Sequence, residues 1–153
     1  MKRFHDENDK LYQEYITSDL AQARKALEKM AEHTSAEIRV SGPAIGVDFG
    51  LYHVLFIDYA RLYALEKRAG NEDMAEAWLI KARYWLLLKL EQAGTMSIQD
   101  RMDGFRRVGD ADHLLHAVTV LDTGADGEGK GPKYLQEIDS MRAANSNNVA
   151  PSR

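Results

Sequence analysis

The segment that most constrains the fold lies between residues 70 and 82, where one helix stops and another begins in the opposite direction. Gly70 suits the left-handed residue that follows a helix end. Asn71 is a good N-cap, and Glu72 and Asp73 place negative charge near the free N–H groups of the next helix. We therefore predict two antiparallel helices joined by a short corner.

Helical periodicity extends through most of the chain. The pattern predicts helices over residues 6–16, 19–32, 51–69, 72–92, 98–108, 111–121 and 132–144. Ser18 can cap the second of these helices, and Asp19 then adds negative charge to its first turn. Ser97 followed by Asp100 is the pattern of a helix start. We expect an all-α chain with a single helical domain over residues 1–144.

Three stretches interrupt the helical pattern. In residues 33–50, glycine and proline indicate mainly a loop, with a short extended piece at residues 38–40. A loop of this length is either functional or an insertion tolerated on the surface. Residues 122–131 form a glycine-rich loop, and residues 145–153 are polar enough for us to predict a disordered tail.

The helix over residues 72–92 carries apolar side chains on every face near Trp85, Leu86, Leu87 and Leu88. A helix that is apolar all round is covered on more than one side. We expect it to be the most buried element, with Trp85 and at least two of the three leucines nearly inaccessible. Either the C-terminal third of the chain or a second subunit would supply the cover.

The two corners, at Ser18 and Gly70, are followed by small or apolar residues at matching positions. These are Ala23, Leu27 and Met30 after the first corner, and Ala75, Leu79 and Ala82 after the second. In these residues the chain resembles the tetratricopeptide-repeat family of stacked helical hairpins, over residues 6–32 and 51–92. The corners lie farther apart than the family's repeat of ~34 residues. The alternative is an unrelated all-α bundle.

The resemblance implies a non-catalytic protein-interaction or scaffold module built on two hairpins and closed by the C-terminal helices. First helices of such hairpins line a concave face, and aromatic and arginine side chains often anchor partners. On this basis the partner-binding residues are Tyr12, Tyr15, Tyr59, Arg61, Tyr63 and Arg68. A basic and aromatic patch on an acidic chain favours an acidic or C-terminal peptide. The alternative is that the tyrosines belong to the core and the basic residues form a solvated face.

A second class of function would use a metal ion. Asp110, Asp112, His113 and His116 are the best candidate ligands, since the two histidines share a helix face. The simpler interpretation is that Asp110 caps a helix. The run from Asp122 resembles a calcium loop only in part, because its twelfth place holds Lys133 instead of glutamate. We favour a flexible loop there, and we expect no bound metal or cofactor.

Composition excludes several other classes. The net charge of −4 argues against a general nucleic-acid-binding protein. The chain has no cysteine, and its apolar runs are too short for a membrane span. Since no nucleophile motif accompanies the histidines, we expect no enzymatic activity. A self-associating helical domain remains a further alternative, and the cytoplasm is the default compartment for a chain without a signal-peptide pattern unless a leader has been removed.

Overall fold

A computed structural model describes residues 2–42, 50–92, 94, 96–124, 129 and 131–148. Within these residues the chain forms seven helices and no strand, which confirms the all-α class. The helices are α1 (Lys2–Thr17), α2 (Leu20–Ser41), α4 (Leu51–Ala69), α5 (Glu72–Gln92), α6 (Ile98–Val108), α7 (Ala111–Thr123) and α8 (Tyr134–Asn148).

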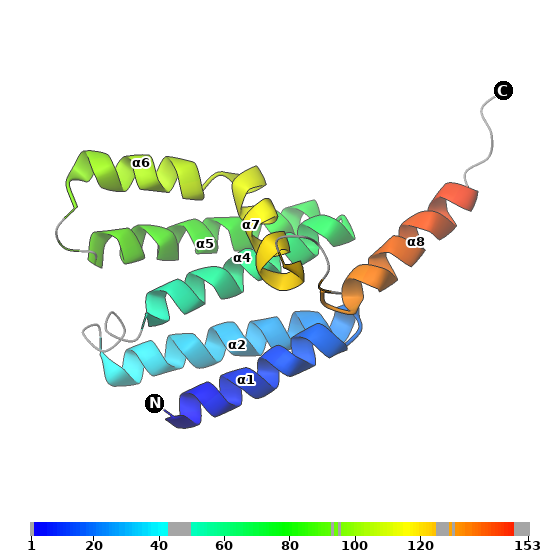
Figure 1. Cartoon of the computed structure of the whole chain (residues 1–153), viewed down its shortest axis with the longest axis horizontal. Helices are drawn as coiled ribbons and strands as arrows, with labels where there is room; N and C mark the ends of the chain where they lie inside the picture. Colours follow the sequence, from blue (N-terminus) through cyan, green and yellow to red (C-terminus); the bar gives the residue numbers. More distant parts are fainter. Residues whose placement is uncertain are drawn as a thin grey trace.

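The helices pair as antiparallel hairpins, as Figure 1 shows. Helices α1 and α2 form one hairpin, and α4 and α5 form the next, with α4 against α2. Helix α6 runs beside α5, whereas α7 turns back to contact α4. The first turns of α8 contact α2, and the rest of α8 projects away from the other helices toward the C-terminus.

The corner between α4 and α5 lies where it was predicted, at residues 70 and 71. Gly70 adopts the left-handed conformation (φ 83°, ψ 12°), and the N–H of Asn71 donates to the carbonyl of Glu66 at 2.9 Å. The side chain of Asn71 points back to α4 as well, where its Nδ2 donates to Glu66 Oε1 at 3.2 Å. Arg24 of α2 donates to the same buried carboxylate at 2.7 Å. The corner is therefore tied to the first hairpin.

The prediction of a loop beginning at residue 33 was wrong, because α2 continues to Ser41 before Gly42 ends it. Thr34 and Ile38 extend the buried row that contains Met30, at intervals of four residues. A threonine in a helical row weakens the sequence pattern, but its hydroxyl bonds to Asp58 of α4. The rest of the predicted loop, residues 43–49, lies outside the described residues.

Other helix boundaries also differ from the prediction, and α1 begins at Lys2, four residues before its predicted start. The N-cap of α2 is Asp19, not Ser18, and its carboxylate accepts from the N–H of Gln22 at 3.0 Å. Helix α8 continues through the first part of the predicted tail to Asn148. Once Tyr134 and Ile138 are buried, adding further turns to a formed helix costs little. Residues 149–153 lie outside the described part of the chain.

The expectation that α5 is the most buried helix was wrong. Helix α4 holds that place, because α2, α5 and α7 pack on different sides of it. On α5 the buried residues lie on one face, at Ala75, Leu79, Ala82 and Leu86. Leu87 is 43% exposed, and Trp85 and Leu88 are half-buried.

Ala75 is only 1% exposed and shares a core cluster with residues of α4, as predicted. We expect Ala75→Leu to lower the free energy of unfolding by about 1–3 kcal/mol, because the larger side chain overpacks the contact between α4 and α5. Urea unfolding measures the change. Ala77→Leu is the matched control, since Ala77 is exposed on the same helix. Equal stability of the two variants would contradict the close packing.

Candidate functional site

The predicted partner-binding face, on α1 and α4, is covered by α7 of the same chain. Tyr15 and Tyr63 are buried and Arg61 is 9% exposed, whereas Tyr12, Tyr59 and Arg68 are half-buried. The six residues therefore do not form one exposed surface.

At the centre of this covered face, Asp122 near the end of α7 meets Tyr15 and Arg61. The hydroxyl of Tyr15 donates to Asp122 Oδ2 at 2.6 Å, and Arg61 Nε donates to Oδ1 at 3.0 Å. The Arg61 guanidinium also lies 5.1 Å from the centre of the Tyr12 ring. Burial, with Tyr134 and Asp122 nearby, raises the pKa of Tyr15 well above its usual value. The acidic group that the arginine binds is thus one of the chain's own.

The remaining residues of the predicted face also contact the chain itself. Arg68 donates to Tyr134 Oη at 3.1 Å and to the hydroxyl of Thr119. Tyr63 packs in the core cluster that includes Leu114 of α7. Tyr59 lies on the other side of α4, where its ring stacks on a tryptophan of α5.

The two metal candidates gain no support from the geometry. Asp110 is the N-cap of α7 and accepts from the N–H of His113 at 3.0 Å, as the simpler interpretation held. Asp112, His113 and His116 are exposed. Across the described ranges, no three histidine, aspartate or glutamate side chains lie close enough to hold one ion. Asp122 faces Arg61, and residues 125–128 of the partial calcium loop lie outside those ranges.

A groove of about 270 Å³ lies between α1, α4 and the end of α7, beside the covered face. We refer to it as the α1–α4 groove. Its polar lining is Asn8, Asp9, Tyr12, His53, Asp58 and Arg61, and its apolar lining is Met30, Val54, Ile57 and Leu121. Of the predicted partner-binding residues, it brings together Tyr12 and Arg61.

Asp58 is the most unusual group in the α1–α4 groove, since its residue is only 1% exposed. Its Oδ2 accepts from Thr34 Oγ1 at 3.3 Å, whereas its Oδ1 has no hydrogen-bond partner among the described residues. Asn8 Oδ1 is likewise buried without a partner in the described part of the chain. Burial raises the pKa of Asp58 to about 7, against the opposing effects of the Arg61 charge and the Thr34 hydroxyl.

Asp58 is not among the residues predicted for the site, although the sequence contains a signal for it. The residue lies on the same helix face as Leu51, Leu55, Leu62 and Leu65, which are all fully buried. A carboxylate in a buried apolar row is rare unless it is paired or functional.

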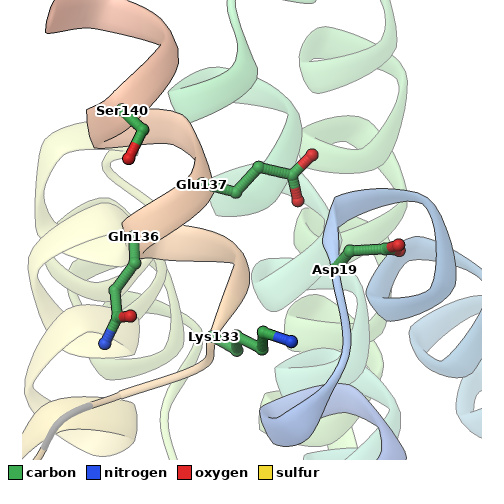
Figure 2. Close-up of a pocket in the computed structure, with 5 residues that line it drawn as sticks. All are labelled: Asp19, Lys133, Gln136, Glu137 and Ser140. Carbon is green, nitrogen blue, oxygen red and sulfur yellow. The ribbon is translucent and has the colours of Figure 1, made fainter.

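A second cleft, of about 290 Å³, lies where α8 meets the corner between α1 and α2. Figure 2 shows Lys133, just before α8, and Glu137, in its first turn, reaching toward the segment that carries Asp19. Glu137 Oε2 accepts from the N–H of Leu20 at 2.7 Å, and the N–H of Lys133 donates to the carbonyl of Ile16 at 2.8 Å. These bonds fasten α8 to the first hairpin, so they give the cleft a structural role.

In comparisons with known proteins, the chain matches no protein-family model, no curated protein and no solved structure. The resemblance to tetratricopeptide repeats therefore stays a prediction. Within the described residues, no helix is long and apolar enough to cross a membrane, in agreement with the sequence-based expectation.

Proposed function

We propose that this protein is a non-catalytic interaction module whose partner protein packs on the outer face of α5. The observation that carries the proposal is a row of exposed apolar side chains. Ile80, Tyr84 and Leu87 are 60%, 56% and 43% exposed. Their spacing of four and three residues places them on one side of the helix, away from the row that packs on α4.

Single exposed apolar residues are ordinary on protein surfaces, whereas a contiguous group of them is typical of a binding surface. Tyrosine is among the residues that contribute most to protein interfaces. The resemblance to stacked helical hairpins favours the same class of function. The proposed contact lies on α5, the second helix of its hairpin, and not on the first helices α1 and α4. On α4, Arg61 already pairs with Asp122, and Arg68 already donates to Thr119 and Tyr134.

The double variant Ile80→Lys, Leu87→Lys tests the proposal, because it places two charges in the row without changing the buried face of α5. We expect at least about tenfold weaker binding of the proteins that the wild type captures on a column, since a few well-packed residues near the centre of an interface carry most of its binding energy. Light scattering of the purified protein distinguishes a second copy of this chain from a different partner. A dimer that the variant converts to monomer identifies the partner as a second copy.

Val40→Lys is the matched control, since Val40 is strongly exposed but belongs to α2. The control should bind as the wild type does. If the double variant keeps both the oligomeric state and the captured proteins of the wild type, the α5 row is not the binding surface.

A further inference from the structure

The row of exposed apolar side chains on α5 has acidic residues beyond both of its ends. Asp73 and Glu76 precede Ile80 by seven and four residues, and Glu91 follows Leu87 by four. Residues at such intervals share one face of a helix, so the three carboxylates continue the row in both directions. All three side chains are exposed, and none of them forms an ion pair with another described residue.

The basic residues of α5 contact groups that lie off the row. Lys81 lies over an aromatic pair formed by α4 and α5, at 5.7 Å and 5.1 Å from the two ring centres. Arg83 donates to the carbonyl of Gly109 at 2.8 Å, and Lys89 Nζ lies 2.9 Å from the ring Nδ1 of a histidine of α4. The row itself therefore presents an apolar centre between two negative ends.

Helix stability explains only part of this charge pattern. Asp73 lies in the first turn of α5, where a negative charge is favourable to the helix dipole. Glu91 lies in the last turn, where a negative charge opposes the dipole. A positive group on a partner would compensate Glu91, which no described side chain does.

The same charges disfavour a second copy of this chain as the partner. Two identical helices related by a two-fold axis can pair antiparallel, with Ile80 of one opposite Leu87 of the other. That register places Glu76 of one copy opposite Glu91 of the other, and a parallel pair places each carboxylate opposite its own equivalent. Like charges in these positions cost binding energy, so a different partner with positive ends fits the row better.

The shape of the row favours a helix as the partner. From residue 73 to residue 91 it extends for ~27 Å at 1.5 Å per residue, along one side of α5. An amphipathic helix buries its apolar stripe against such a surface. Resting on the interaction surface proposed above, we propose that the partner is an amphipathic helix whose apolar stripe carries lysine or arginine at both ends.

Two synthetic helical peptides of about 20 residues test the proposal, a length that matches the row. Both have the same leucine stripe, and they carry either lysines or glutamates at its two ends. Calorimetric titration into the full chain measures binding. We expect the lysine peptide to bind saturably and the glutamate peptide to bind at least about tenfold more weakly, because like charges then face each other.

A triple variant removes the acidic ends and leaves the apolar centre unchanged: Asp73→Asn, Glu76→Gln, Glu91→Gln. It should bind the lysine peptide at least about tenfold more weakly than the wild type, and its binding should depend less on salt. The matched control removes three exposed carboxylates from α1, α7 and α8, through Asp6→Asn, Asp112→Asn and Asp139→Asn. Both variants change the net charge equally, and the control should bind as the wild type does.

Three results would overturn the proposal: no saturable binding of the lysine peptide, equal binding of the glutamate peptide, or unchanged binding by the acidic-end variant. If Ile80→Lys, Leu87→Lys still abolishes dimerisation or protein capture in these cases, the row stays the binding surface and only the chemistry of its partner is wrong. If that double variant changes neither, the proposed function itself fails.

Discussion

Asp122→Ala is expected to lower the free energy of unfolding by about 3–5 kcal/mol, because it breaks a buried ion pair. Asp122 is nearly inaccessible and is the partner of Arg61 and Tyr15. Its removal leaves the guanidinium of Arg61 buried without a counter-charge and also detaches the end of α7 from α1. Urea unfolding followed by circular dichroism measures the loss.

Asp103→Ala is the control for this prediction, since the Asp103–Arg106 pair has both side chains exposed and should contribute less than about 1 kcal/mol. The double variant Arg61→Met, Asp122→Leu removes both charges and should recover most of the lost stability. If Asp122→Ala costs no more than Asp103→Ala, the pairing of α7 with α1 and α4 is not what holds this face closed.

The second large effect is a dependence of stability on pH that comes from Asp58. Its pKa is about 7 in the folded protein against an ordinary value of 3.8, so the folded state binds more protons than the unfolded state between these values. The free energy of unfolding therefore falls as pH rises from about 4 to about 7. A difference of about three pKa units corresponds to up to about 4 kcal/mol.

Comparison of the wild type with Asp58→Asn isolates this contribution from the other titrating groups. The variant should be the more stable protein above pH 7, with the difference shrinking as pH falls toward 4. Urea unfolding at pH 5 and pH 8 measures it, and Asp139→Asn should follow the wild type at both. Parallel pH profiles of wild type and Asp58→Asn would show that Asp58 titrates normally.

Local signals in the sequence predicted the helices because their causes are local. The turn at Gly70 and the caps at Ser97 and Asp110 depend on hydrogen bonds to groups only a few residues away. The small residue at position 75 also predicted a close helix contact correctly. In contrast, the extension of α2 through Thr34 depends on a partner in α4, and no local pattern shows that partner.

Burial was the harder property to predict, because it depends on which neighbours cover a face. The apolar residues around Leu87 suggested that α5 is the most buried helix, yet α6 covers only part of it and Leu87 stays exposed. The tyrosines and arginines of α1 and α4 suggested an open binding face, yet α7 of the same chain lies on it. Both errors concern contacts between different helices, which the pattern within one helix does not show.

By itself, the sequence determined the all-α class and the positions of the turns. It also showed which helices carry aromatic and basic side chains. Only the tertiary structure decided that α7 covers the α1 and α4 face, with Asp122 against Arg61. It also brought Asn8 and Asp58 to one groove and left the α5 row exposed. Helix formation depends on hydrogen bonds and side-chain spacing within a few residues. The environment of a side chain instead depends on how different helices pack against one another. That packing buries the Asp58 carboxylate, with a hydrogen bond to Oδ2 and no partner for Oδ1 among the described residues.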